Sequence, residues 1–484
     1  MLVRDLRRLA LLLIPLLLLV YSFFRCLPGW STNQYLEIES WIEHKFSPDS
    51  NLLEQEQAVT SYRIDELPIN SESSSAGITD TSPSPSHNHD GDEGSVSLFS
   101  LGPNPSDTHI ELSSVSNPGG KYFSIRFGDK LAFNPNIIPH PLLDNTWTIV
   151  AQQYNELVTL AVQFVEIACD AVFNEQSSEL ACVFPPIQLP IAPTGPGNCR
   201  GDLEYASLNT GPHDARVFYG PRTPFTIYGS NSQQMCFGQW IQDFGVLINW
   251  QGIRGTGDED EEKPEQKSNI FQLGTELQRP PPISSMEKNW FIFWDLDDQM
   301  YAHYDIYPRR VFSKLDAHGT AGPDLAPLAA ASGDKQCMAK YMPTPGPQHE
   351  SIHQASNALS ITLCRRSDAD CTPNGTNTFL FTIFQHKTYH NFHSLYEPYV
   401  MLFRQQAPFE IHGISQKPLW IRGRDAEERM FYVTSVSWKG GRQTYHGYVD
   451  DVVFVGFGIE DRESGGIDVL ASDLLRGLGI CAEG

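Results

Sequence analysis

The sequence lacks the short motifs that mark several common enzyme classes. It contains no GxGxxG, no Walker-type phosphate loop and no GxSxG segment, so dinucleotide-binding, P-loop and serine-hydrolase folds have no local signature here. It is also poor in basic residues, because 34 Lys and Arg stand against 58 Asp and Glu, a formal net charge of −24. A surface of that sign does not attract a phosphate backbone, which argues against a nucleic-acid-binding protein.

Charged residues are scarce as well. They make up 19% of the 484 residues, whereas hydrophobic residues make up 40%. Such a chain is able to bury a large core beneath a mostly neutral polar surface. Its length allows one large domain or two to three smaller ones.

The nine cysteines include no CxxC pair, so the sequence gives no indication of a structural zinc site. Cys26 lies beside the N-terminal apolar run. The other eight are an even number and favour disulfide bonds in an oxidising compartment, with Cys364 and Cys371 as the expected local pair. These eight are Cys169, Cys182, Cys199, Cys236, Cys337, Cys364, Cys371 and Cys481.

The only long apolar run, Leu9–Phe24, follows three arginines and is closed by Arg25. A positive N-terminal flank predicts a cytoplasmic N-terminus and a lumenal remainder. The run is somewhat short for a full span, and a cleaved signal peptide has a similar core. Because no small-x-small cleavage site follows, we favour a signal anchor over residues 1–30, with the cleaved signal as the alternative.

Residues 31–117 lose the core-forming pattern. Within them Ser71–Ser97 is rich in Ser, Pro, Asp and Gly and has almost no large apolar residue. Such a segment cannot bury enough surface to offset its ordering entropy, so a flexible stalk is predicted. The acidic insert Gly257–Lys267 is interpreted as a solvated loop, and Asn374-Gly375-Thr376 is the one N-glycosylation sequon.

From about Tyr122 onward, short apolar or alternating runs bounded by Gly, Pro and Asn predict many β-strands. Examples are NWFIFWD, FLFTIFQHK and DDVVFVGFGIED. A helical pattern is confined to Trp147–Val172, with a C-terminal turn at Ile467–Leu478. Many strands without alternating helices predict a mainly β domain over residues 118–484, and a β-propeller rather than a sandwich because one sandwich is too small.

Polar residues interrupt the expected strand ends in five clusters. A propeller gathers the inner strand ends of successive blades around one axis, so five clusters are what a five-bladed site needs. The clusters are Phe133–Pro141, Gly211–Val217 with Arg222 beyond, Glu287–Trp290, His386–Tyr399 and Tyr445–Asp451.

Several residues in these clusters have the chemistry that reactions of sugars require. Asp214 can move a proton at the reacting centre, and Arg216, two residues on, lies on the same strand face and can hold a phosphate or orient that carboxylate. Lys288 can contact a phosphate, Asn289 sugar hydroxyls and Trp290 a sugar face. The ordinary alternatives are a surface turn with an ion pair and a solvated strand start.

Metal binding has weak support. The four histidines between His386 and His412 lack metal-ligand spacing. Asp295-Leu296-Asp297 resembles the DxD of nucleotide-sugar transferases, which holds a divalent cation, but the β context favours a hairpin turn. We predict no metal ligand, and a divalent cation remains an open alternative.

These segments, in order, resemble those of a known family. GPHDARV is similar to the Gly-x-x-Asp-x-Arg segment of the inverting β-mannoside phosphorylases and hydrolases, which are five-bladed propellers. EKNW and YHGYVDDVVFVGFGIED resemble their Lys-Asn and Tyr-x-Gly-x-x-Asp segments. The lumenal architecture and the C-terminal run are more similar to the fungal β-1,2-mannosyltransferases, which are type II Golgi proteins. The resemblance covers about Tyr122–Cys481.

The resemblance implies a set of roles. Asp214 corresponds to the catalytic acid/base. Contacts to phosphate or to the donor diphosphate fall to Arg216, Arg222 and Lys288. The sugar subsite is formed by Asn289, Tyr445, His446 and Asp450. HDAR stands where the phosphorylases have Glu-Asp-Pro-Arg, a departure that sets this chain apart from phosphorolysis.

Anchor, stalk and lumenal β domain together predict a single-pass type II enzyme of the Golgi membrane. By the resemblance it transfers a hexose, mannose in β linkage, from a nucleotide sugar such as GDP-mannose to a glycan acceptor with inversion. Two alternatives stay open: a glycosidase or phosphorylase on the same propeller, and a non-catalytic glycan-binding lumenal protein. The sequence does not fix the oligomeric state.

Overall fold

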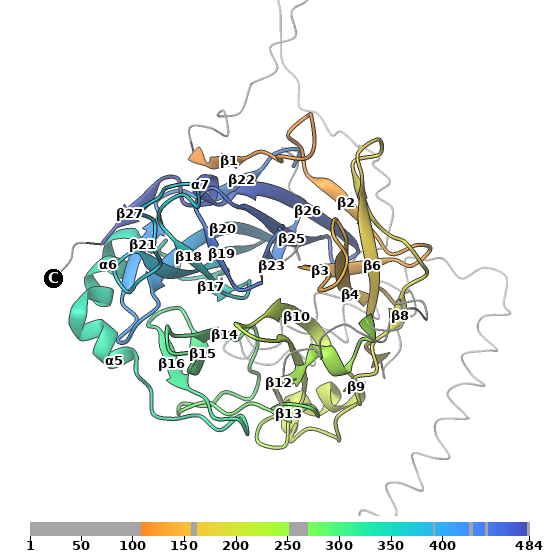
Figure 1. The fold of residues 1–484 in the computed structure, drawn as a ribbon. Helices are drawn as coiled ribbons and strands as arrows, with labels where there is room; N and C mark the ends of the chain where they lie inside the picture. The colour runs from red at the N-terminus through yellow and green to blue at the C-terminus, as the bar shows by residue number, and fades with distance from the viewer. Residues whose placement is uncertain are drawn as a thin grey trace, which may run out of the picture. The chain divides into compact units, whose positions relative to one another are not determined.

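The computed structural model describes residues 108–155, 162–250, 270–390, 393–424, 429–440 and 444–481. These residues form mostly antiparallel sheets with little helix, which confirms the mainly β prediction (Figure 1). The predicted anchor (1–30), most of the stalk (31–117) and the acidic insert (257–267) lie outside the described residues. Among the residues that are described, no helix has the length and hydrophobicity to cross a bilayer.

The largest sheet has nine strands and combines strands from the N-terminal and the C-terminal parts of the described chain. β2 lies in its middle, antiparallel to β26 and parallel to β7. The strand order is β23 (Phe431–Trp438), β25 (Val452–Ile459), β26 (Glu463–Leu470), β2 (Phe123–Arg126), β7 (Glu179–Cys182), β6 (Glu166–Asn174), β4 (Trp147–Gln153) and β3 (Ala132–Pro139), with β8 (Ile187–Gln188) paired to β6.

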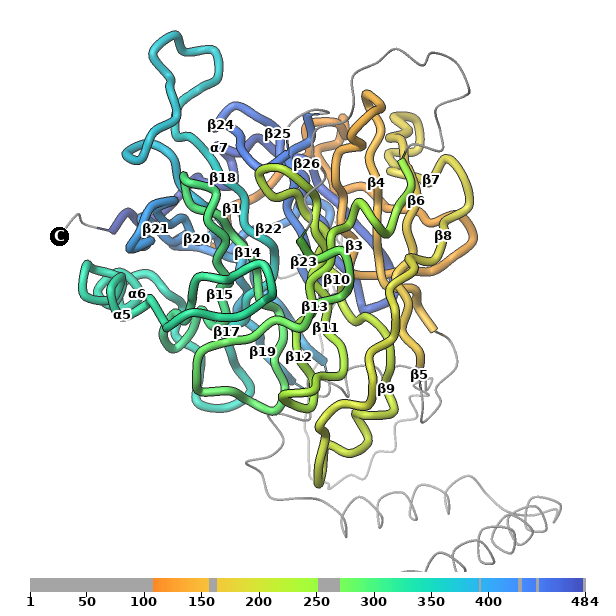
Figure 2. Tube along the Cα trace, turned by 60° about the horizontal axis from the view of Figure 1, so that its bottom comes forward, coloured from red at the N-terminus to blue at the C-terminus, as the bar shows by residue number. Residues whose placement is uncertain are grey.

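Two smaller sheets are simple meanders in chain order. In Figure 2 the first of them lies beside β3, and the second lies next to the first. The first contains β10 (His213–Tyr219), β11 (Pro224–Asn231), β12 (Phe237–Asp243) and β13 (Thr275–Glu276); the second contains β14 (Phe291–Trp294), β15 (Met300–Asp305) and β16 (Val311–Lys314).

The remaining large sheet has seven strands around the long β19–β20 hairpin. Its order is β24 (His446–Tyr448), β18 (Leu359–Thr362), β19 (Thr378–His390), β20 (His393–Arg404), β21 (Ile411–Ser415) and β27 (Leu478–Ile480), with β17 (Glu350–Gln354) on β19. Two-stranded parallel pairs join β1 (Ile110–Leu112) to β22 (Leu419–Ile421) and β5 (Val162–Gln163) to β9 (Asn209–Thr210). β1 therefore lies before the predicted domain start at residue 118.

The sheets follow one another around a common centre, where β3, β10, β14, β17 and β23 lie (Figure 1). β10 contacts both β3 and β23 there. Meanders arranged in this way are how a propeller is constructed, while the number of blades stays a prediction. Short helical pieces join the strands: η1 (Gly201–Leu208), η2 (Phe244–Val246), α5 (Ala326–Ala329), a π turn η4 (Ala330–Asp334), α6 (Lys335–Tyr341) and α7 (Ala471–Leu474).

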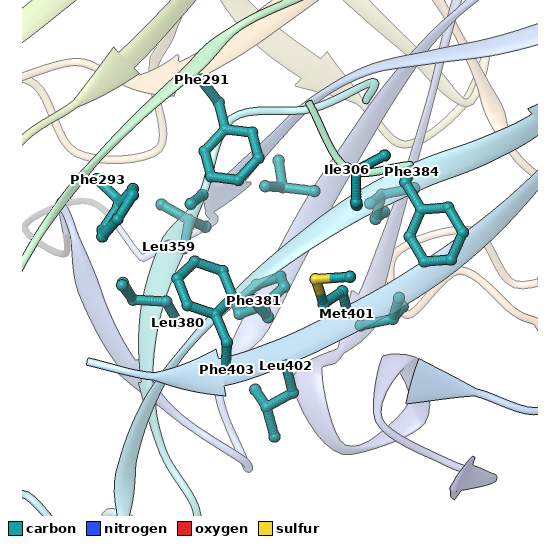
Figure 3. Packing of buried hydrophobic residues seen from close by; sticks show 14 of the residues in the cluster. Phe291, Phe293, Ile306, Leu359, Leu380, Phe381, Phe384, Met401, Leu402 and Phe403 are labelled. Carbon is teal, nitrogen blue, oxygen red and sulfur yellow. The ribbon is translucent and has the colours of Figure 1, made fainter. Parts of the chain in front are cut away.

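Aromatic residues from neighbouring sheets fill the space between them. Phe291 and Phe293 of β14 face Phe403 of β20, with ring centroids of Phe293 and Phe403 5.5 Å apart (Figure 3). All four residues of β14 are buried. A strand covered on both faces shows a continuous apolar run instead of alternation, which explains the FIFW sequence.

The helical prediction for Trp147–Val172 is wrong. β4, β5 and β6 occupy this segment, and the first six residues of β4 are all buried. A continuous apolar stretch is compatible with a buried helix or a strand buried on both faces, so its periodicity alone does not distinguish them. The predicted C-terminal turn is part strand, part helix, because β26 runs to Leu470 before α7 begins.

The eight cysteines predicted to form disulfides do so. Cys364 bonds to Cys371, the expected local pair. The other three bonds join Cys169 to Cys182, Cys199 to Cys236, and Cys337 to Cys481.

Candidate active site

Polar residues with left-handed backbone lie where strands of different sheets approach the centre. Asn134 (φ 56°) is in β3, Asp214 (φ 49°) in β10, Asn289 (φ 60°) just before β14 and Asp461 (φ 46°) just after β25. Asn and Asp are the non-glycine residues that adopt this conformation most readily. Backbone strain of this kind tends to gather at functional sites, so these positions identify where to look.

Asp214 is held in place by the neighbouring sheet. Asn134 Nδ2 donates to Asp214 Oδ1 at 2.7 Å, and the amide of Asp214 donates to Gln152 Oε1 at 2.8 Å. The pairing of β10 with β11 is irregular between His213 and Arg216, as in a β-bulge. The bulge turns the Asp214 carboxylate out of the ladder and toward residues of β3.

Arg216 also stabilises the bulge of β10. Its guanidinium donates to Asp214 O at 2.7 Å through Nη1 and to Ala355 O at 3.1 Å through Nε. The side chain is 4% exposed, and it lies 5.9 Å from the ring centre of Tyr432. Arg216 therefore ties β10 to the segment after β17, which is a positioning role in addition to any contact with a ligand.

Two lysines and two carboxylates interact around this point. Burial lowers the pKa of Lys288, which Asp214 and Asp461 counteract. Burial and then Lys288 lower the pKa of Lys387, and Asp461 opposes them. Burial, followed by Asp214 and Glu460, raises the pKa of Asp461 to about 7, although the two lysines act to lower it. Each of the four groups interacts with at least two of the others, so their charges lie within one site.

The surroundings of these charges are polar and mostly neutral. Burial and then Lys288 lower the pKa of His213 to about 3, and burial and then the two lysines lower the pKa of His353 to about 4. Burial raises the pKa of Tyr432 to about 12 and also raises that of Tyr396, whose ring stands edge-on to Tyr432 at 4.9 Å. Both histidines are therefore neutral and both phenols protonated at neutral pH.

We call this set the central cluster. Its members are Asn134, Glu166, His213, Asp214, Arg216, Lys288, His353, Lys387, Tyr396, Tyr432 and Asp461. Apart from Asn134, Glu166 and Arg216, which are buried, they keep partial solvent exposure. Strong desolvation of charged groups that still reach solvent is a pattern found at functional sites.

Four polar atoms of the central cluster are buried and make no hydrogen bond within the described part of the chain. They are Asn134 Oδ1, Glu166 Oε2, His213 Nε2 and Arg216 Nη2. Buried polar groups nearly always have a partner, so each exception needs an explanation. These atoms are therefore available to bind a polar ligand.

The other predicted site residues lie elsewhere. The Tyr445 hydroxyl accepts from the Trp294 amide at 3.0 Å, His446 contacts Thr362, and Asp450 accepts from the Arg366 amide at 2.8 Å. Asp450 precedes β25 and Asp461 follows it. At about 3.3 Å per residue, eight strand residues put the two strand ends roughly 26 Å apart.

The three remaining predicted contact residues, Arg222, Trp290 and Asn289, lie in three different environments. Arg222 is 80% exposed and pairs with Asp298 on the surface. Trp290 is 1% exposed, packs edge-on against Tyr304 and donates to Glu287 Oε2. Asn289 lies beside the central cluster, with its carbonyl accepting from Gln354 Nε2 at 3.1 Å.

The Asp295–Asp297 motif is the hairpin turn between β14 and β15. Asp295 Oδ1 accepts from the amides of Asp297 and Gln299 at 2.9 and 2.8 Å, and Oδ2 accepts from the Tyr301 hydroxyl. Across the described ranges, no three His, Cys, Asp or Glu side chains are grouped to hold a metal ion.

Three residues of the central cluster, Asp214, Arg216 and Lys288, were selected from the sequence, and the others were missed. Lys387 and Tyr396 fall within the fourth polar cluster, and Asp461 ends the quoted FGIED strand. The sequence therefore pointed to these segments but did not select these residues. Glu166 lay inside the expected helix, where nothing marked it.

Two clefts occur elsewhere on the described residues. One, of about 660 Å³, lies between Tyr307–Arg310 and the helical residues 326–344, and another, of about 630 Å³, is lined by His109, Lys417 and Arg476. Neither is lined by a residue of the central cluster. The central cluster instead brings lysines and a carboxylate with shifted pKa values together in one place, as sites that carry out chemistry do.

No protein-family model and no curated protein sequence matches the chain. Several solved structures are similar to it. A β-1,2-mannobiose phosphorylase from Listeria innocua covers 74% of this chain and 92% of its own, with 10% identity and a TM-score of 0.38. A GDP-Man-dependent mannosyltransferase from Leishmania mexicana covers 75% and 92%, with 9% identity and a TM-score of 0.34.

An α-L-arabinofuranosidase from Lactobacillus brevis is similar to the same degree, with 10% identity and a TM-score of 0.37 over 70% of this chain and 90% of its own. Likeness at this level establishes neither the fold nor the activity of the chain. The functional argument therefore depends on the central cluster.

Proposed function

We propose that the chain is a glycan-processing enzyme, and specifically a glycosyltransferase that transfers mannose from a nucleotide sugar such as GDP-mannose to a glycan acceptor with inversion. The observation that carries the proposal is the central cluster, which combines two carboxylates with two lysines in one desolvated site. Glycosyl transfer needs both, a carboxylate to move a proton and cations to accept a departing phosphate.

The proposed roles follow from the contacts. The carboxylate of Asp214, held by Asn134 and by the bulge of β10, accepts the proton of the acceptor hydroxyl as it attacks the anomeric carbon. Lys288 and Lys387 stabilise the departing diphosphate. Partial desolvation strengthens both effects, because charges interact more strongly where water is scarce. Asn289 and the phenols of Tyr396 and Tyr432 are available for sugar hydroxyls.

The test uses the purified full-length chain in detergent. Wild type is incubated with a panel of nucleotide sugars and with mannoside acceptors, and both nucleoside diphosphate release and glycan products are measured. We expect Asp214→Asn to lower kcat by roughly 10²–10⁴-fold, the usual contribution of a general base, without loss of folding. A correctly folded wild-type protein that transfers no sugar from any donor contradicts the proposal.

A second candidate is a phosphorylase on the same scaffold. Lys288 lowers the pKa of Lys387, and that repulsion is relieved by any phosphate, free or bound in a nucleotide sugar. Incubation with inorganic phosphate and a β-mannoside distinguishes the two. Release of sugar 1-phosphate without a nucleotide donor selects the phosphorylase.

We also propose that the described domain is a five-bladed propeller whose last blade, β23, β25 and β26, is completed by β2. The pairing of β2 with β26 supports this proposal, because it joins the N-terminal and C-terminal strands as a closed ring requires. An experimental structure that resolves the blades tests it.

The proposed location is the Golgi lumen, with a single-pass type II anchor and glycosylation at Asn374. Asn374 is exposed, and its Oδ1 accepts from the amide and the hydroxyl of Thr376 at 2.9 and 2.6 Å. A loss of mass on endoglycosidase treatment, absent in Asn374→Gln, is expected together with protection from protease in sealed membranes. A protein that is never glycosylated and is digested in sealed membranes contradicts this topology.

A further inference from the structure

Two side chains on adjacent strands hold the bulge of β10. Gln152 of β4 and Glu166 of β6 stand directly opposite each other in the ladder. Gln152 Oε1 accepts from the amide of Asp214 at 2.8 Å, and Glu166 Oε1 accepts from the amide of Ala215 at 3.1 Å. One cross-strand pair thus captures two consecutive amides that the irregular β10–β11 pairing leaves available.

A third side chain completes this support. Asn136 of β3 donates through Nδ2 to Ala215 O at 2.7 Å and accepts from the Val217 amide at 3.0 Å. The backbone on either side of Asp214 is therefore fixed by side chains where a neighbouring strand normally does so. Removing one of them leaves a buried amide or carbonyl unpaired, which is costly.

Glu166 differs from Gln152 and Asn136 because it can ionise. It is 1% exposed, and burial raises its pKa to about 8, with Asp214 raising it further and the Ala215 amide and Arg216 lowering it. The charged groups that act on it, Asp214 and Arg216, are both on β10, while its partner on β4, Gln152, is neutral. Since Oε1 accepts a hydrogen bond, the proton belongs on Oε2, which has no partner within the described residues.

We propose that Glu166 is a positioning residue that, together with Gln152, holds the bulge of β10 so that the Asp214 carboxylate keeps one orientation toward the substrate. This deepens the proposed function and depends on it, because Asp214 is the group assigned to the acceptor proton. Neutral Glu166 supports the bulge without competing for the cations of the site. Ionised Glu166 puts a second negative charge beside Asp214, and repulsion between the two carboxylates disturbs that geometry, so we expect kcat of wild type to decline at alkaline pH.

The first test compares Glu166→Gln with Glu166→Ala in the full-length protein. Glutamine keeps the acceptor for the Ala215 amide and cannot ionise, so we expect kcat near neutral pH within about threefold of wild type and a loss of the alkaline decline. Alanine removes the acceptor, and we expect kcat to fall by about 10- to 100-fold with KM within about twofold, as for a misplaced catalytic group. Equal losses in both variants, or full activity in Glu166→Ala, overturn the proposal.

The second test needs no activity. Hydrogen–deuterium exchange of the peptide that contains Asp214–Val217 is expected to be faster in Glu166→Ala than in wild type, and unchanged in Glu166→Gln. Equal exchange in wild type and Glu166→Ala overturns the positioning role. If exchange behaves as expected while wild type transfers no sugar, the proposed function fails and the positioning role stands.

Glu350→Ala is the matched control for Glu166→Ala. Glu350 Oε2 also accepts from a backbone amide, that of Gly346 at 2.8 Å, but it belongs to β17 and is not in the central cluster. Exchange of Asp214–Val217 is expected to remain as in wild type. An equal acceleration in this control shows a general loosening of the fold and overturns the specific role of Glu166.

Discussion

At the scale of single residues, the central cluster is defined by which charges are forced together. Asp214, Asp461, Lys288 and Lys387 come from four separate strands or strand ends, and each changes the pKa of at least one other. Perturbed ionisation of this kind is characteristic of sites that move protons or bind charged ligands.

Asp461 is expected to give the enzyme a pH dependence in the neutral range. Its pKa is raised to about 7, chiefly by burial and by Asp214, so it is neutral below that pH and ionised above it. Ionisation adds negative charge beside the lysines, and we expect KM for an anionic donor to rise as pH passes 7. Asp461→Asn should abolish that rise, as measured by kcat/KM against pH.

The same shift has a consequence for stability. Folding disfavours the ionised form of Asp461, so its contribution is fully present below the ordinary carboxyl pKa and is lost as pH rises to about 7. Wild type should therefore lose Tm relative to Asp461→Asn over this window and no further above it. A difference in Tm that is independent of pH contradicts the assignment.

Arg216 is expected to be irreplaceable by lysine. The guanidinium of Arg216 donates hydrogen bonds to both Asp214 O and Ala355 O, and the ammonium of a lysine cannot reproduce both bonds. We expect Arg216→Lys to lower the free energy of unfolding by about 2–4 kcal/mol, because a buried charge loses a partner, and to lower kcat as well. Urea unfolding and activity assays measure the two effects.

Arg222→Lys is the matched control for stability. Arg222 is 80% exposed and its pair with Asp298 is on the surface. Such pairs contribute about 0–1 kcal/mol, so unfolding should hardly change. A loss as large as that of Arg216→Lys contradicts the structural difference between the two arginines.

At the scale of elements, the site depends on close approach between strands. Gly458 of β25 lies against β3, where an added Cβ comes within 2.4 Å of Asn134 Oδ1. Asn134 is the residue that donates to Asp214. The glycine is therefore required by the side chain across from it, even though its own backbone is ordinary extended strand.

Gly458→Ala is expected to displace Asn134 and so to loosen Asp214. We expect a loss of about 1–3 kcal/mol of unfolding free energy, as for overpacking, together with a clear fall in kcat. Gly322→Ala is the control, since its nearest atom would be Lys314 O at an ordinary 3.5 Å. Equal effects of the two substitutions on kcat contradict the proposed link between β25 and Asp214.

At the scale of the whole molecule, contacts distant in sequence join the two ends of the described chain to the sheets. β2 pairs with β26, β1 pairs with β22, and Asp468 of β26 accepts from Ser116 and Lys439. The disulfide between Cys337 and Cys481 joins α6 to the residue after β27. These links hold the sheets that carry the central cluster in a fixed relation.

The disulfides should differ in their contribution according to the loop each one closes. Cys337 and Cys481 are 144 residues apart, against 7 for Cys364 and Cys371. Loop-closure entropy gives about 5 kcal/mol for the first and about 2 kcal/mol for the second. Paired Cys→Ser variants should show the larger loss of Tm for Cys337–Cys481, and the reverse order contradicts this account.

The sequence by itself determined the mainly β class, the presence of disulfide bonds expected of an oxidising compartment and the segments that carry the site. Period-two patterns, turn residues and clusters of polar residues are local properties, so they can be recognised without a fold. Asp214 and Lys288 were identified in this way. The same local signals failed at Trp147–Val172, where a continuous apolar run fits a helix or a strand equally well.

Only the tertiary structure decided which residues meet. Asp450 and Asp461 flank the same strand, and the resemblance selected Asp450. A strand has two ends, however, and only the end that bears Asp461 reaches the central cluster. Glu166 could not be identified from the sequence for a related reason. Its role depends on its pairing with Gln152 across the sheet and on the bulge in β10. Strand register and strand direction depend on contacts between residues distant in sequence, and they decide which residues form the candidate site.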